Sequence, residues 1–203
     1  MYALPVDVRY VYPEFRTGVV QFRNGRIGGG AMNYSALLEE MEFITEKDTM
    51  ALDDIESVKY IQFEKDTFYR VQKFFVMQIA VNGEYRLCER RVVSLINRER
   101  YGGHGEIQGS STVNTIDQLS SGVNTLRKMV AKELMTFTLD KTYYFGDRFG
   151  NFKVANRKNL LDMFGKKYPA LENFLAQNKI NYSKEDDMRL VLEFLAIDEQ
   201  KKK

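Results

Sequence analysis

The sequence predicts an α+β protein in which an antiparallel β meander, or a small barrel-like sheet, is followed by a C-terminal helical cap. Two observations predict this class. Short strand-like segments follow one another over residues 9–96 without room for crossover helices, which favours antiparallel pairing. The last part of the chain, from about residue 156, instead repeats apolar side chains at the spacing of helices.

Two Asn-Gly pairs mark hairpins in the strand-rich region. Asn24-Gly25 and Asn82-Gly83 each lie between two segments rich in β-branched and aromatic residues. Asn-Gly is a strong hairpin signal, because both residues accept the positive φ of a type I′ turn. Closing or curling the resulting meander would limit the number of exposed strand edges.

Composition divides the chain into three parts. Residues 1–98 are expected to form the antiparallel β-rich domain. Residues 99–122 are rich in Gly, Ser and Thr, which is typical of a flexible loop. Residues 123–203 are expected to contain a short helix, a β-hairpin and the C-terminal helices.

The C-terminal helices have clear start and stop signals. Asn156 is a good N-cap for a helix that ends near Gly165. Pro169 suits the first turn of the next helix. In the last helix an apolar stripe recurs at the i, i+3, i+4, i+7 spacing and predicts packing on the sheet; its members are Met188, Val191, Leu192 and Leu195.

Charge and cysteine content restrict the function classes. The 30 basic and 28 acidic side chains give a formal net charge of +2. A nucleic-acid partner is therefore not expected, since the chain lacks a general positive field. Cys88 is the only cysteine, so no intrachain disulfide forms. No apolar run reaches the roughly 20 residues of a membrane-spanning helix, and no membrane span is expected.

Five arginines form the main candidate binding feature: Arg86, Arg90, Arg91, Arg98 and Arg100. Guanidinium groups bind carboxylates and phosphates through paired hydrogen bonds, so this segment is a candidate patch for an anionic ligand. The alternative is a strand edge whose charges prevent self-pairing. The balanced charge of the whole chain favours the alternative.

His104 is the candidate of the glycine-rich loop, in Gly102-Gly103-His104-Gly105. As the only histidine it cannot belong to a two-histidine metal site, and a nucleophilic relay would need Cys88, Ser110 or Ser111 as its partner. Cys88 falls in a predicted strand, where a buried thiol is inert. We therefore assign no catalytic residue, no metal ligand and no cofactor.

Several segments together resemble a family of uncharacterised, mostly exported proteins of Bacteroidota. The segments are GVVQFRNG at 18–25, DDIESV at 53–58, residues 75–87, Tyr101-Gly102, residues 142–152 and residues 159–164, in that order. The resemblance implies a β meander with a C-terminal helical cap. It also implies export to the periplasm or cell surface, with the signal peptide absent from this chain. It supplies no catalytic residues.

These observations together favour a non-enzymatic binding or structural module of the bacterial envelope, with an envelope protein or a glycan as its partner. Two alternatives stay open. One is a hydrolase or transferase whose site lies in the glycine-rich loop around His104. The other is a cytoplasmic nucleic-acid or nucleotide accessory protein that uses the arginine-rich strand.

Overall fold

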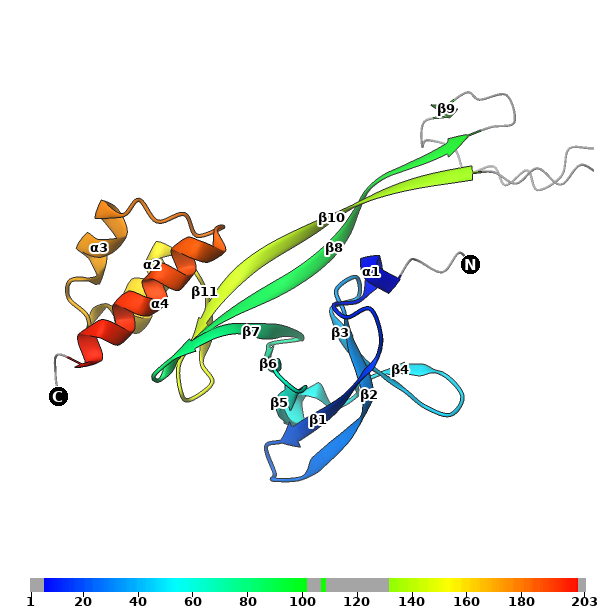
Figure 1. Cartoon of the computed structure of the whole chain (residues 1–203), viewed down its shortest axis with the longest axis horizontal. Helices are drawn as coiled ribbons and strands as arrows, with labels where there is room; N and C mark the ends of the chain where they lie inside the picture. The colour runs from blue at the N-terminus through cyan, green and yellow to red at the C-terminus, as the bar shows by residue number, and fades with distance from the viewer. Residues whose placement is uncertain (1–5, 102–106, 109–131, 201–203) are drawn as a thin grey trace, which may run out of the picture. The chain divides into compact units, whose positions relative to one another are not determined.

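The computed structural model describes residues 6–101, 107–108 and 132–200. Most of the described chain is an antiparallel sheet, and the helices lie mainly in its C-terminal part (Figure 1). The strands are β1 (Arg16–Phe22), β2 (Ile27–Ser35), β3 (Glu40–Ile44), β4 (Thr49–Ala51), β5 (Val58–Gln62), β6 (Thr67–Val71), β7 (Phe74–Asn82), β8 (Tyr85–Tyr101), β9 (Ile107–Gln108), β10 (Lys132–Gly146) and β11 (Phe152–Val154). The helices are α1 (Val6–Arg9), η1 (Ile55–Ser57), α2 (Arg157–Leu160), η2 (Leu161–Gly165), α3 (Leu171–Gln177) and α4 (Glu185–Gln200).

The strands follow the order β11-β10-β8-β7-β6-β5-β1-β2-β3-β4, with β9 beside β8. The predicted antiparallel sheet with a helical C-terminal part is confirmed. The sheet is open, so the closed form of the predicted small barrel does not occur. Its end strands β4 and β11 have three residues each, which offers little backbone for a closing ladder. Short end strands also limit edge-to-edge association.

Contacts divide the chain into two units, residues 1–92 with 140–203 and residues 93–139. In the second unit β9 pairs with β8, where Tyr101 is the register partner of Ile107. Of the short helix expected after residue 122, residues 132–134 belong instead to β10, and the rest lies outside the described residues.

Hairpins form at both Asn-Gly pairs as predicted, but not through type I′ turns, because Asn24 and Asn82 lack the positive φ that such a turn requires. Gly25, between β1 and β2, has a φ of 86°, and Gly83, between β7 and β8, has a φ of 57°. L-residues with a Cβ rarely adopt these positive values. The two glycines therefore set the registers of their hairpins, which place Gln21 opposite Ile27 and Asn82 opposite Tyr85.

The first apolar cluster fills the inside of the curl made by β1 to β7. We call it the curled-sheet cluster: Tyr12, Val20, Met32, Tyr34, Met41, Val58, Ile61, Phe63, Phe68 and Phe75. The Tyr34 ring lies 5.6 Å from the Phe68 ring and 6.4 Å from the Phe75 ring, centroid to centroid. Side chains of β2 therefore pack against those of β6 and β7, although these strands are not hydrogen-bonded to β2.

A buried amide holds the N-terminal segment against this curl. Asn33 Oδ1 accepts hydrogen bonds from the backbone N–H groups of Tyr12 (3.2 Å) and Tyr34 (2.9 Å). Its Nδ2 donates to the carbonyls of Tyr12 (2.9 Å) and Glu14 (3.2 Å). Asn33 is fully buried, yet its amide is satisfied on both sides, as a buried polar group must be.

A β-bulge in β7 provides a backbone group that the last helix binds. Gln78 pairs with Cys88 and Ala80 with Leu87, which leaves Ile79 without a register partner. A bulge frees backbone groups that would otherwise join the ladder. The Ile79 carbonyl accepts a hydrogen bond from Arg189 Nη2 of α4 at 3.1 Å. The sheet irregularity therefore becomes an attachment point for the last helix.

The second apolar cluster joins β8 and β10 to the helices. We call it the helix-side cluster: Tyr85, Leu87, Tyr143, Phe145, Ala155, Leu160, Phe164, Tyr168, Leu171, Leu175, Ile180, Met188, Val191, Leu192 and Leu195. The predicted apolar stripe of the last helix is buried in it. The predicted N-cap is also confirmed, since Asn156 Oδ1 accepts from the Asn159 N–H at 2.9 Å.

The third cluster lies on the opposite face of the same strands. We call it the back-face cluster: Val76, Cys88 and Tyr144, packed against Tyr69, Val71, Phe74, Phe152 and Val154. Because side chains alternate along a strand, Cys88 faces this cluster, whereas Leu87 faces the helices. Strand β8 is thus covered on both faces over this stretch.

Two leucines of α4 test how much the helix contributes to the fold. Leu192 is 3% exposed within the helix-side cluster, and Leu190 is 40% exposed. Truncating a buried leucine to alanine costs about 2–5 kcal/mol, whereas surface changes stay within about 0.5 kcal/mol. We expect Leu192→Ala to lower the free energy of unfolding in urea by that larger amount and Leu190→Ala to leave it nearly unchanged. Equal midpoints for the two variants would contradict the docking of α4.

Candidate functional site

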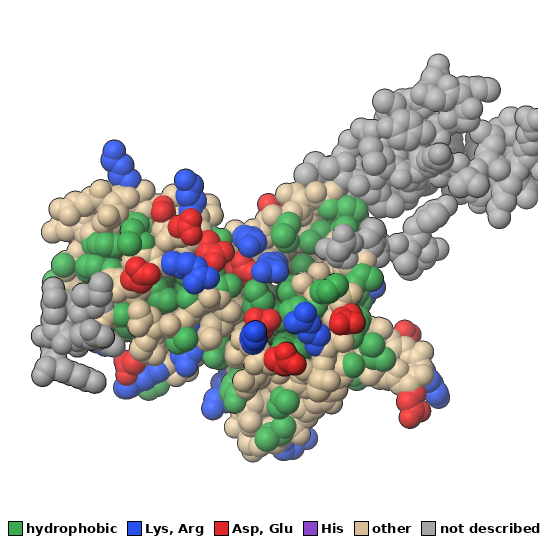
Figure 2. Space-filling model, viewed as in Figure 1, with side chains coloured by type: hydrophobic (Ala, Val, Ile, Leu, Met, Phe, Trp, Pro, Cys, Tyr) green, Lys and Arg blue, Asp and Glu red, His purple; other side chains and the backbone are tan. Residues whose placement is uncertain are grey.

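The described arginines of the predicted anionic patch lie on two faces of β8. Arg86 and Arg90 share the face of Cys88, and Arg91 shares the face of Glu89, since side chains alternate along the strand. Arg98 and Arg100 belong to β8, but their side chains are outside the described part of the structure. The described arginines are therefore not brought together into one patch. Acidic and basic side chains are interspersed on the visible face (Figure 2).

Arg86 binds groups of the protein itself. Its Nε donates to Tyr69 Oη at 3.2 Å, and its Nη1 donates to the Asp147 carbonyl at 2.9 Å. The guanidinium also lies over the Tyr69 ring, 5.5 Å from its centroid. Arg86 thereby links β6 to the turn between β10 and β11, a structural use of the side chain.

Arg90 is held by a carboxylate on the far side of the curl. Its Nε and Nη2 donate to the two oxygens of Glu39, at 2.5 and 2.7 Å, and its guanidinium lies 4.1 Å from the Phe74 ring centroid. The hydrogen bond with Glu39 raises the pKa of Arg90, against the lowering effect of burial. Glu39 has a φ of 59°, so the turn that presents its carboxylate is locally strained. This pair ties the β2–β3 turn to β8.

Arg91 belongs to an ionic group around a buried carboxylate. Glu89 is 1% exposed, and its Oε1 accepts from Arg91 Nε at 2.5 Å. Lys141 Nζ of β10 lies 3.1 Å from Glu89 Oε2, an ion pair that lacks the geometry of a hydrogen bond. Two cations around one buried anion offset the free energy of removing the carboxylate from water.

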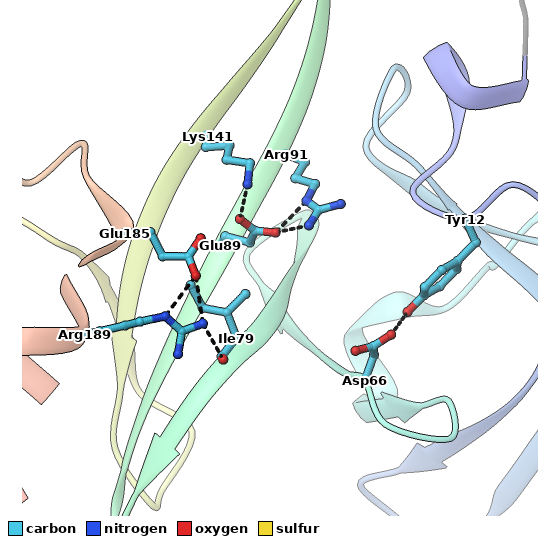
Figure 3. Close-up of polar contacts among 8 residues, drawn as sticks. All are labelled: Tyr12, Asp66, Ile79, Glu89, Arg91, Lys141, Glu185 and Arg189. Atoms are coloured by element: carbon cyan, nitrogen blue, oxygen red, sulfur yellow. Dashed lines mark hydrogen bonds and ion pairs between the residues drawn. The ribbon is translucent and has the colours of Figure 1, made fainter. Parts of the chain in front are cut away.

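A second ion pair lies beside the first on the same sheet face. Glu185 Oε1 accepts from Arg189 Nε (2.9 Å) and Nη2 (2.7 Å). Figure 3 shows Glu89 with Arg91 and Lys141, and Arg189 bridging Glu185 and the Ile79 carbonyl. Burial raises the pKa of the neighbouring Tyr143, and the Glu185 and Glu89 charges raise it further. We call Glu89, Arg91, Lys141, Glu185 and Arg189 the ionic cluster.

A small hollow adjoins the ionic cluster, with an empty volume of about 160 Å³ that includes open solvent. It has no room for a water molecule and therefore none for a ligand. Its lining includes Tyr34, Met77, Glu89 and Arg91. Among the described groups Tyr34 Oη has no hydrogen-bond partner of good geometry, although the Phe75 backbone is close enough to lower its pKa slightly. Burial outweighs this effect and raises the pKa of Tyr34.

The remaining candidates from the sequence give no site in the described residues. His104 lies outside them. Within residues 6–101, 107–108 and 132–200, no group of three or more His, Cys, Asp or Glu side chains is arranged to hold a metal ion. No helix of these ranges is long and apolar enough to cross a membrane. Cys88 is fully buried, and burial raises the pKa of its thiol.

An uncovered sheet surface escaped the sequence analysis. Ten residues of β1, β2, β5 and β6 on the face opposite the curled-sheet cluster are all outside the buried class, and none carries a charge. We call them the uncharged face: Thr17, Val19, Gln21, Ile27, Gly29, Ala31, Tyr60, Gln62, Thr67 and Tyr69. In a chain with 29% charged residues such a set is unusual. Alternation was the signal that could have found it, because the members of the set that share a strand are two residues apart.

Comparison of the chain with protein-family models, with curated proteins and with solved structures finds no match.

The ionic cluster makes a prediction about stability. Glu89→Gln keeps the shape but removes the charge that pairs with Arg91 and Lys141, and a hydrogen bond to a charged group contributes about 1.5–3 kcal/mol. We expect Glu89→Gln to lower the free energy of unfolding by that order. Glu84 is a matched control, because it pairs with Arg148 and Lys167 at an exposed site, where ion pairs contribute at most about 1 kcal/mol. A Glu84→Gln variant at least as destabilised as Glu89→Gln would refute this account.

Cys88 makes a prediction about reactivity. Its raised pKa keeps the thiol neutral, and the thiolate is the reactive species. We expect an aromatic disulfide reagent at pH 8 to leave Cys88 unmodified in the native protein and to label it fully in denaturant. Since the folded pKa is raised, stability from the neutral thiol is present below the ordinary value of 9.0 and falls as the pH rises above it. Rapid labelling without unfolding would be the contrary result.

Proposed function

We propose that this chain is a non-enzymatic binding or structural module of the bacterial envelope, located in the periplasm or at the cell surface. The observation that carries the proposal is the uncharged face, an exposed surface of the same sheet whose other face is packed as a core. Surfaces with exposed apolar groups among polar ones often mark interaction sites. The location in the envelope is supported by the resemblance of the sequence segments to exported proteins.

The charged side chains support a binding role rather than chemistry. Arg86, Arg90 and Arg91 each bind a group of this protein. An enzyme keeps reactive groups poised toward a site that holds substrate, whereas these contacts join elements of the fold. The thiol of Cys88 is held neutral in the back-face cluster, where it packs as a small apolar side chain.

Fractionation of cells that produce the protein tests its location. We expect an antibody against the chain to find it in the periplasmic or surface fraction, and purified protein to sediment with isolated envelopes. A matched sample with cytoplasmic extract in place of envelopes serves as the control. Recovery from the cytoplasm together with no sedimentation would overturn the proposal.

The same envelopes test the enzymatic alternative. A hydrolase would release soluble fragments over time, and His104→Ala would abolish the release if the glycine-rich loop carries the site. We expect no time-dependent release by the parent protein. Retention on envelopes should be equal for the parent and the His104→Ala variant.

A further inference from the structure

The uncharged face has its side chains in rows that cross the strands. In one row Ile27 pairs with Gln21, and Gln21 pairs with Tyr60. The row continues to Tyr69, whose ring lies 6.3 Å from that of Tyr60. Neighbouring strands lie about 4.8 Å apart, so the four strands present a surface about 14 Å across.

The second row runs beside the first. Val19 pairs with Gly29 on one side and with Gln62 on the other, and Gln62 pairs with Thr67. Gly29 is exposed, and a Cβ there would lie 2.9 Å from the Gly18 carbonyl oxygen. The position therefore favours glycine, which leaves the backbone open in the middle of the face. Apolar and hydrogen-bonding side chains are thus interspersed across the face.

Several of these groups are already held in place. Gln21 Nε2 donates to the carbonyls of Phe22 (3.3 Å) and Arg26 (3.2 Å). Tyr69 Oη accepts from Arg86. A binding group that is fixed before the ligand arrives loses less conformational entropy on binding. All of the face lies on strands, which position side chains more rigidly than loops do.

Charge decides which ligand fits. The ten side chains carry no charge, and the guanidinium of Arg86, which contacts one of them, binds Tyr69 and the Asp147 carbonyl. A phosphate or carboxylate ligand needs cations with free donors, and an ionic ligand would lose hydration here without a charged partner. The face therefore matches a neutral ligand.

Hydrogen-bonding capacity decides between neutral ligands. The amide of Gln62 and the hydroxyls of Thr17, Thr67 and Tyr60 are both donors and acceptors, as sugar hydroxyls are, and Gln21 adds its Oε1 as an acceptor. Val19 and Ile27, 44% and 69% exposed, and the tyrosine rings offer apolar contact to the carbon-bound hydrogens of a sugar ring. A protein interface instead has an apolar centre with large anchors that become fully buried.

We propose that the uncharged face binds a neutral oligosaccharide, with Tyr60 as the ring contact, the Gln62 amide as donor and acceptor, and Gln21 Oε1 as a further acceptor. This rests on the proposed function as an envelope-binding module and names the class of its ligand.

The test uses the full chain and carbohydrate from the isolated envelopes. The envelopes are digested with protease and extracted to remove lipid, and the polysaccharide is separated by anion exchange into neutral and acidic fractions. Binding of each fraction is measured by isothermal calorimetry. We expect the parent protein to bind the neutral fraction, with an affinity that is unchanged between low and high salt, because no ion pairs form.

Two variants on the face have matched controls elsewhere. Tyr60→Ala removes a ring, and Gln62→Glu puts a charge on the face; each should weaken binding at least about tenfold. Phe149→Ala removes a more exposed ring in the β10–β11 turn, and Gln177→Glu places the same charge on exposed α3; both should bind as the parent does. Melting curves confirm that every variant is folded.

The outcomes separate this inference from the proposed function. Sedimentation with envelopes but no binding of the neutral fraction overturns the oligosaccharide ligand and leaves the envelope module standing. Sedimentation that is lost after protease treatment of the envelopes would indicate a protein partner on the face and overturns it as well. Salt-sensitive binding of the acidic fraction or of single-stranded DNA would do the same. If the protein neither sediments nor binds carbohydrate, both proposals are wrong.

Discussion

The strand pair β7–β8 has to bury side chains on both of its faces, and the arrangement of the first unit depends on this requirement. Phe75 contributes to the curled-sheet cluster and Leu87 to the helix-side cluster, while Cys88 lies in the back-face cluster. Glu89 lies on the face of Leu87 and is the register partner of Met77, which packs against the curled-sheet cluster. The ionic cluster therefore lies at the boundary between the curled-sheet cluster and the helix-side cluster. The Lys141–Glu89 ion pair links β10 to β8, and the hydrogen bond from Arg189 to the Ile79 carbonyl links α4 to β7.

This arrangement has a consequence for function. Charged side chains that the sequence offers as a binding patch are used to join elements: Arg86 reaches the β10–β11 turn, and Arg90 reaches Glu39. Farther along the strand order, β1 and β5 present uncharged residues on one face, the face to which the proposed function assigns the partner. Under the proposed function, structural and binding roles are divided between two parts of one sheet, and the uncharged face carries the binding role.

Local signals in the sequence predicted the local features of the fold. The positive φ at Gly25 and Gly83 follows from Asn-Gly, and the cap at Asn156 follows from its side chain. Long-range pairings could not be predicted from the sequence, because the residues of one strand do not specify which distant strand it pairs with. The pairing of β1 with β5 and the open sheet are of this kind. The arginine-rich segment was predicted as a binding site from its composition alone. The groups that Arg86 and Arg90 bind are far away in sequence, so the sequence did not show that these side chains are already paired. The uncharged face was missed for the opposite reason, since its residues are ordinary one at a time.

The position of β1 in the sheet also determines the order in which the sheet can form during synthesis. β1 pairs with β2 across a short turn, but its other neighbour, β5, is synthesised only after β2, β3 and β4. Closing the longer loop is entropically slower than forming the hairpins, so a chain emerging from the ribosome exposes the free edge of β1 until β5 arrives. β1 is seven residues long, and its residues Val19, Val20, Gln21 and Phe22 pair with β5 in the finished sheet. This edge is therefore exposed only during folding, and the partition between folding and aggregation depends in part on how quickly β5 pairs with it.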